Sequence, residues 1–210
     1  MDQTDVTIAA VEGVGPDAIV LRLETPPGFE AQPGQFVKLE MTVDGEEASR
    51  FYTISSPTAT GTFDLTIGID PDGDVSPHLR DLSAGDAVTL SGPYGSDYYE
   101  GETSVLLLAG GPGIGAAIGI AERAIADGGQ AALVYRDDQP IHESRLDALR
   151  EDATVIVLDA DEPLDDAIER TLTDDAQVFV YGFADFLDDA ITALEAAGGE
   201  PDAAKLENFG

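Results

Sequence analysis

The sequence predicts a two-domain protein whose amino-terminal half is all-β and whose carboxy-terminal half is α/β. Two observations predict this. Short alternating or β-branched segments, separated by turn residues, fill roughly the first hundred residues. After about Tyr99, continuous apolar segments alternate with helical segments, which is typical of a parallel sheet. We therefore expect domains at residues 1–98 and 99–210.

The amino-terminal half has the strand spacing of a small barrel or sandwich. A short helix is predicted around Pro77, which suits a first helical turn, with Asp74 or Ser76 as the cap. Turns rich in Gly, Pro and Asp separate the strands. The predicted strands are 6–10, 19–23, 36–41, 51–54, 63–69 and 87–90.

The carboxy-terminal half alternates buried-type strands with helices. The predicted strands are 104–109, 131–135, 154–158 and 177–181. A helix rich in Ala and Ile follows the first strand, and further helices are predicted at 141–150, from Pro163 onward and at 184–197.

Composition excludes several classes of function. The chain carries 42 Asp and Glu against 10 Lys and Arg, a formal net charge of −32. Nucleic acids and anionic membrane surfaces are excluded as partners, because both are bound through basic patches. With no cysteine, the chain cannot form disulfides or Cys-ligated zinc or iron–sulfur centres, and two histidines are too few for a multi-histidine site. No metal site is expected.

The acidic residues are spread along the whole chain rather than gathered in one block. This favours a protein of a salt-accumulating extreme halophile, since molar salt screens the self-repulsion of such a chain. The alternative is an acidic protein with a basic partner. We expect a cytoplasmic location, because no apolar run approaches the roughly 20 residues of a membrane span and the start of the sequence lacks the features of a signal peptide.

The segment Leu106–Ala116 reads as a strand, a glycine turn and the start of a helix. Glycines let the backbone approach a diphosphate, and a helix amino terminus stabilises its charge. No Gly-Lys-Ser/Thr follows, so this is not a Walker loop, and Pro112 removes one amide donor. From these residues alone, dinucleotide binding and a glycine turn needed only for packing both stay open.

A second constellation lies in the amino-terminal half. Arg50, Tyr52 and Ile54 share one face of a predicted strand, because alternate side chains point the same way. A cation, a flat phenol and nearby hydroxyl groups suit a ligand with a phosphate and an aromatic ring. The alternative is a structural ion pair of Arg50, with Tyr52 in the core.

In order and spacing, several motifs together resemble the ferredoxin–NADP reductase superfamily, which includes ferredoxin/flavodoxin reductases and oxygenase reductase components. The resemblance covers nearly the full length. It implies an FAD-binding antiparallel six-stranded β-barrel followed by an NAD(P)-binding α/β domain with a five-stranded parallel sheet. The motifs that carry it are Pro33–Val37, Arg50–Thr53, Pro71–Leu79, Gly92–Gly95, Gly110–Ala116, Tyr181–Phe183 and Glu207–Gly210.

The resemblance also implies roles for residues around FAD. Arg50 would pair with the diphosphate, Tyr52 would stack on the ring or bond the ribityl chain, and Thr53 would bond the flavin near N5 and O4. Phe209 would cover the outer face of the ring. The expected FAD-binding residues are Arg50, Phe51, Tyr52, Thr53, Ile67, Gly73, Asp74, Val75, Ser76, Gly111, Pro112 and Phe209.

The expected catalytic residues are Thr53, Tyr181 and Glu207. Glu207 would relay protons to the flavin, the alternative being a surface carboxylate or a carboxy-terminal bridge. Tyr181 stands where the superfamily has a Cys near the site of hydride transfer. The expected NAD(P)-binding residues are Gly110, Gly111, Gly113, Ile114, Tyr135, Arg136, Asp159, Gly182 and Phe183.

The co-substrate is expected to be NADH or NADPH. NADPH-specific proteins that this chain resembles place Ser-Arg where it has the acidic segment Leu158–Glu162. Carboxylates repel a 2′-phosphate and accept from a ribose hydroxyl, which favours NADH. Arg136 or Arg170 could compensate for these acids.

These expectations combine into an FAD-dependent oxidoreductase that passes hydride from NAD(P)H to flavin, and electrons on to a carrier protein such as ferredoxin. One alternative is a non-catalytic FAD-binding electron-transfer subunit of a larger complex. Another is a flavin-free nucleotide-binding sensor. His78 is expected to be a surface or packing residue, and His142 a residue at a helix start.

Overall fold

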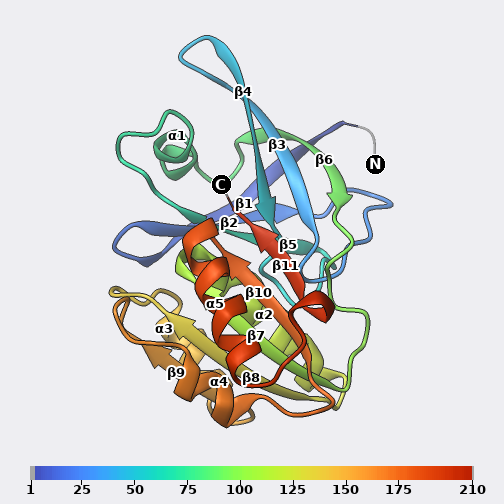
Figure 1. The fold of residues 1–210 in the computed structure, drawn as a ribbon. Helices are drawn as coiled ribbons and strands as arrows, with labels where there is room; N and C mark the ends of the chain where they lie inside the picture. The colour runs from blue at the N-terminus through green and yellow to red at the C-terminus, as the bar shows by residue number, and fades with distance from the viewer. Residues whose placement is uncertain (1–2, 210) are drawn as a thin grey trace.

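The computed structural model describes residues 3–209. Met1, Asp2 and Gly210, the last of which ends the predicted carboxy-terminal motif, lie outside the described residues. The fold consists of two lobes, each built on one sheet (Figure 1). This confirms the predicted two-domain fold class.

The amino-terminal lobe is a six-stranded antiparallel sheet with strand order β4-β3-β6-β1-β2-β5. The sheet is barrel-like but not closed by a ladder, because within residues 3–209 a single bridge, between Ile54 and Leu65, joins its two edges. Apolar residues that alternate along these strands fill the interior. The elements are β1 (Thr4–Gly15), β2 (Ala18–Glu24), β3 (Phe36–Val43), β4 (Glu46–Thr53), β5 (Thr62–Gly68), α1 (Ser76–Asp81) and β6 (Ala87–Tyr94).

The carboxy-terminal lobe is a five-stranded parallel sheet with strand order β11-β10-β7-β8-β9. Residues of α2 and α3 bury one face of it, and residues of α4 and α5 bury the other, so the central strand β7 is wholly buried. The elements are β7 (Ser104–Gly110), η1 (Gly111–Gly113), α2 (Ile114–Ala126), β8 (Gln130–Arg136), α3 (Glu143–Leu149), β9 (Thr154–Leu158), α4 (Asp165–Thr171), β10 (Gln177–Gly182), α5 (Ala184–Ala196), η2 (Pro201–Ala203) and β11 (Lys205–Asn208).

Three local predictions need correction. Neither Asp74 nor Ser76 caps α1: the residue at the cap is Val75, and the Ser76 hydroxyl accepts from the Asp70 backbone N–H at 2.9 Å instead. The third helix starts at Glu143 rather than at residue 141, because His142 has a left-handed backbone with φ of 60°. The scan for apolar strands also missed β11, a short and partly charged edge strand.

The predicted boundary at residue 98 falls between β6 and β7 and stays a prediction. Across residues 3–209, no helix has the length and apolar content needed to cross a membrane.

Candidate functional site

A cavity of about 770 Å³ lies between the two lobes. Its volume falls within the range of roughly 300–1,000 Å³ typical of ligand pockets. The amino-terminal lobe supplies β4, β5 and the segment after β5, and the carboxy-terminal lobe supplies the glycine loop and the end of the chain. The wall is made by Asp17, Ser49, Arg50, Phe51, Tyr52, Thr53, Thr66, Ile67, Gly68, Ile69, Asp70, Pro112, Ala116, Phe183, Glu207, Asn208 and Phe209.

The structure brings together much of the predicted FAD-binding set in this wall. Arg50, Phe51, Tyr52, Thr53, Ile67, Pro112 and Phe209 all line it. The predicted segment Gly73–Ser76 does not, because Val75 is buried in the core of the amino-terminal lobe and the Ser76 hydroxyl is bonded to Asp70.

Arg50 is a cation without a carboxylate partner in a strongly acidic chain. Eight of the ten Lys and Arg residues form ion pairs with described carboxylates, and Arg50 and Arg170 do not. The Arg50 guanidinium donates one hydrogen bond, from Nη1 to the Ser49 carbonyl at 2.8 Å. The structural ion pair considered from the sequence is therefore not found within residues 3–209, and the charge is available to an anion.

Tyr52 lies beside Arg50 in the same wall and is half-buried. Burial raises the pKa of its phenol to about 12, and the nearby Arg50 charge opposes that rise. The ring is therefore neutral at ordinary pH, which suits stacking or hydrogen bonding with a ligand.

Thr53 and Glu207 join the two lobes at the cavity. The Thr53 hydroxyl donates to Glu207 Oε1 at 2.7 Å, across 154 positions of sequence. Burial raises the pKa of the Glu207 carboxyl to about 7, with a further rise from Asp97, while the bond from Thr53 acts to lower it. Glu207 is thus poised to hold or release a proton near neutral pH.

Tyr181 lies next to these residues but behind the wall of the cavity: it pairs with Glu207 across β10 and β11, and its ring centre lies 6.5 Å from that of Phe209. Its side chain is fully buried, and its hydroxyl donates to the Asp97 carbonyl at 3.1 Å, close against Gly34. Because it does not line the cavity, the tyrosine links β10 to the segment between the lobes. Its predicted catalytic role stays a prediction.

The glycine loop combines packing with one open position. Gly110 accommodates the Phe186 ring, Gly113 lies against the Tyr181 backbone, and Gly115 lies against Thr66 of the other lobe. Gly111 differs: it has a φ of 55°, and no atom comes closer than 4.0 Å to the position of an added Cβ. Most of the loop's glycines are therefore explained by packing, and Gly111 alone presents accessible backbone.

Of the other predicted NAD(P)-binding residues, Ile114 and Gly182 are buried, while Phe183 is 51% exposed and lines the cavity. Tyr135 is buried and donates from its hydroxyl to Asp137 Oδ2 at 3.2 Å. Burial is the main cause that raises its pKa. Asp159 follows β9, and its backbone N–H donates to Glu162.

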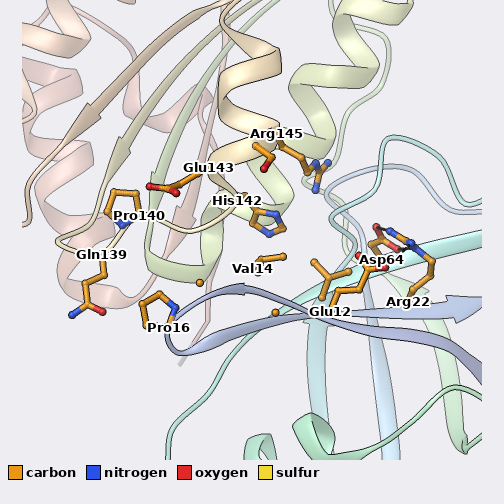
Figure 2. A pocket seen from close by; sticks show the side chains of 14 residues that line it. Glu12, Val14, Pro16, Arg22, Asp64, Gln139, Pro140, His142, Glu143 and Arg145 are labelled. Carbon is orange, nitrogen blue, oxygen red and sulfur yellow. Dashed lines mark hydrogen bonds and ion pairs between the residues drawn. The ribbon is translucent and has the colours of Figure 1, made fainter.

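A second interlobe cavity, of about 850 Å³, lies between the β1–β2 hairpin and the start of α3 (Figure 2). Its two arginines are already paired: Arg22 with Asp64 at 2.8 Å, and Arg145 with Glu122 at 2.8 Å. Neither arginine of its wall is left without a carboxylate partner in the way that Arg50 is. The cavity that contains Arg50 is therefore the better candidate site.

His142, which sequence reasoning treated as a plain helix-start residue, holds the lobes together beside the second cavity (Figure 2). Its Nε2 lies 2.8 Å from the Thr66 hydroxyl, and its backbone N–H donates to the Val14 carbonyl. Burial, with the nearby Arg145 charge, lowers its pKa to about 4. The partners are too distant in sequence for any local pattern to reveal this contact. His78 lies on α1 and is half-buried.

Comparison with known proteins supports the assignment of the lobes. Residues 5–99 match the family described as an oxidoreductase FAD-binding domain. A glycine betaine monooxygenase reductase subunit of Chromohalobacter salexigens is 41% identical over 97 residues, which are 43% of this chain and 26% of that protein. A mouse NADH-cytochrome b5 reductase-like protein is 36% identical over 112 residues, covering 51% of this chain and 35% of its own length.

The alignments thus cover only a quarter to about a third of these relatives. The structural similarity extends over a larger part of the chain than these sequence alignments. A ferredoxin NADP+ reductase from Neisseria gonorrhoeae, solved with bound FAD and NADP, superposes with a TM-score of 0.81 over 100% of both chains at 19% sequence identity. Residues 5–99 therefore match an oxidoreductase FAD-binding domain, and the chain over its whole length has the same two-domain fold as this ferredoxin NADP+ reductase.

Proposed function

We propose that the chain is an FAD-dependent oxidoreductase that takes hydride from NAD(P)H and passes electrons to a separate carrier protein. The observation that carries this proposal is the position of Arg50. This cation has no carboxylate partner among the described residues and lies in the wall of the interlobe cavity, and the lobe that contains it matches an FAD-binding domain. The relatives named as a monooxygenase reductase subunit and as NADH-cytochrome b5 reductase-like support the same reaction class.

The residues of the cavity fit FAD. Arg50 supplies a planar guanidinium for the diphosphate, and Tyr52 supplies a neutral aromatic face. Two aromatic side chains of the other lobe, Phe183 and Phe209, meet edge to face at 6.3 Å and give the opposite wall an apolar surface. FAD, when bound, supplies the hydride acceptor and releases electrons to the next protein.

Thr53 and Glu207 supply proton handling at the same cavity. The Thr53 hydroxyl donates to Glu207 Oε1, and both residues line the cavity, so a half-buried carboxyl lies next to the ligand space. Since the pKa of Glu207 is about 7, its carboxyl exchanges a proton readily at physiological pH. We assign the pair the role of holding a proton next to the coenzyme.

The electron acceptor is proposed to be a separate protein such as a ferredoxin. The chain has no cysteine, so it cannot itself hold a Cys-ligated iron–sulfur cluster. The dispersed acidic residues and the proposed use of a nicotinamide coenzyme support a place in the cytoplasm of a salt-accumulating cell.

An absorption spectrum and a reductive titration test this proposal. The purified chain in molar KCl should be yellow, and at least one of the two nucleotides, NADH and NADPH, should bleach it. Arg50→Ala should lower the affinity for FAD at least tenfold. Arg170→Ala should leave that affinity unchanged, because it removes the other arginine that lacks a described carboxylate partner, and this arginine lies on α4, outside the cavity. Flavin that binds but is never reduced would favour a non-catalytic electron-transfer subunit, and failure to bind flavin would favour a nucleotide sensor.

A further inference from the structure

One arginine stands at the edge of the parallel sheet where α/β domains bind nucleotides. Arg136 ends β8 and pairs there with Gly110 of β7 and Leu158 of β9. In dinucleotide-binding units, the strand end that follows the glycine loop faces the adenosine ribose. A carboxylate there accepts from a free 2′-hydroxyl, while an arginine there binds a 2′-phosphate. The direction in which Arg136 is held therefore bears on which nucleotide the chain accepts.

The guanidinium of Arg136 is engaged by two residues in the first turns of α5. Its Nη2 lies 2.7 Å from Asp189 Oδ2, and its central carbon lies 5.3 Å from the centre of the Phe186 ring. The Arg136 side chain is only 14% exposed. The Phe186 ring is itself fixed, because it packs on Gly110 and Gly182 where a Cβ would collide with it. The cation is thus occupied on the α5 side of the sheet.

The loops at the same edge carry carboxylates. Asp138 Oδ1 accepts from the Ala160 backbone N–H at 2.9 Å and so ties the loop after β8 to the loop after β9. Asp137, Asp159 and Glu162 lie in these two loops. Carboxylates of this kind repel a 2′-phosphate and are suited to a ribose hydroxyl.

The other arginine named by the sequence cannot compensate. Arg170 lies in the last turn of α4, the helix that runs back between β9 and β10. Because the two strands are in one parallel sheet, the end of their connecting helix lies at the amino edge of the sheet, away from the nucleotide edge. Of these two arginines, Arg136 is therefore the one that stands at the nucleotide edge.

We propose that Asp189 determines nucleotide specificity by engaging Arg136, so that the chain selects NADH and rejects NADPH. This inference rests on the proposed function, because it names the co-substrate of the same site. Loss of the Asp189 charge frees a guanidinium one strand away from β9, where it meets a 2′-phosphate.

The test measures binding of two adenine ligands that lack the nicotinamide. ADP-ribose and 2′-phospho-ADP-ribose are titrated into the full chain by calorimetry in molar KCl. The unaltered chain should bind ADP-ribose at least tenfold more tightly. Asp189→Asn should reduce this preference at least threefold by strengthening the binding of the 2′-phosphate ligand. Asp188→Asn, which removes the same charge from the neighbouring position, should leave the preference unchanged.

A double variant separates release of Arg136 from simple loss of negative charge. Adding Arg136→Gln to Asp189→Asn should restore the preference for ADP-ribose. Equal binding of both ligands by the unaltered chain, or an unchanged preference in Asp189→Asn, overturns the inference while leaving the proposed reaction intact. Failure of both ligands to bind the unaltered chain, together with failure of NADH and NADPH to bleach the flavin, overturns the proposed function as well.

Discussion

Glu207 shows how burial of one side chain sets a property of the site. The carboxyl is held in the wall between two lobes, with the Thr53 hydroxyl as a donor. Desolvation outweighs that hydrogen bond, so its pKa rises to about 7. An identical carboxylate on an exposed strand would titrate near 4.3. The sequence could name Glu207 as a candidate only through its motif, because burial depends on the packing of both lobes.

The raised pKa predicts a specific dependence of stability on pH. Between about 4.3 and 7, folded Glu207 holds a proton that the unfolded chain has lost. The free energy of unfolding should therefore fall as pH rises through this window and level off above it. The loss of stability over this window is at most on the order of 4 kcal/mol. Denaturant unfolding of the flavin-free chain at several pH values, compared with Glu207→Gln, isolates it.

The comparison is needed because His142 acts with the opposite sign. Its pKa is lowered to about 4, so the unfolded chain binds a proton that the folded chain does not between about 4 and 6.5. Its stabilisation is therefore lost as pH falls through that range. This contribution is common to the unaltered chain and Glu207→Gln and cancels in their difference. A difference curve that is flat from pH 4.3 to 7 would contradict the assignment to Glu207.

Helix α2 follows the glycine loop directly and also packs against the amino-terminal lobe. Gly115 and Gly119 lie one turn apart and face the amino-terminal lobe, against Thr66 and Ser55 respectively. Thr66 in turn bonds to His142 of the other lobe. The absence of two side chains therefore lets the helix approach the β-sheet closely enough for the lobes to share a cavity.

This close approach predicts that Gly115→Ala destabilises the protein. In an exposed helix the change would stabilise by about 1 kcal/mol. Here the new methyl group meets the Thr66 side chain and Ser55 Cβ, and overpacking of this kind costs about 1–3 kcal/mol. Denaturant unfolding should show a net loss of about 1 kcal/mol. Gly13→Ala on β1, where an added Cβ meets nothing within 4 Å, should show no comparable loss.

The helices and strands also show which parts of the fold sequence patterns can predict. Alternation and apolar runs predicted the first ten strands in order, because those strands bury regular faces. They could not predict β11, because its polar side chains interact with residues far away in the sequence. Lys205 forms an ion pair with Glu102, and Glu207 accepts a hydrogen bond from Thr53. In the site, the Arg50–Thr53 segment was found from its pattern. The Thr66–His142 contact and the engagement of Arg136 by Asp189 were not, because they depend on tertiary packing.

At the scale of the whole molecule, surplus negative charge governs the response to salt. The ion pairs found in residues 3–209 lie at or near the surface, where each is worth about 0–1 kcal/mol. Salt weakens these attractions, but it also weakens the repulsion within a chain of net charge −32. Because Asp and Glu outnumber Lys and Arg by 42 to 10, relief of repulsion outweighs loss of the pairs.

The free energy of unfolding should therefore rise with KCl concentration, opposite to the behaviour of a protein held by surface ion pairs. The Debye length falls from about 10 Å at 0.1 M to about 3 Å at 1 M, so most of the rise should occur below about 1 M. Urea unfolding across this range measures it. Sucrose serves as the control, because it favours compact states without screening charge and should not reproduce the early rise. A midpoint that stays constant or falls between 0.1 and 1 M KCl would show that the acidic surface is not self-repelling and would remove the argument for a high-salt environment.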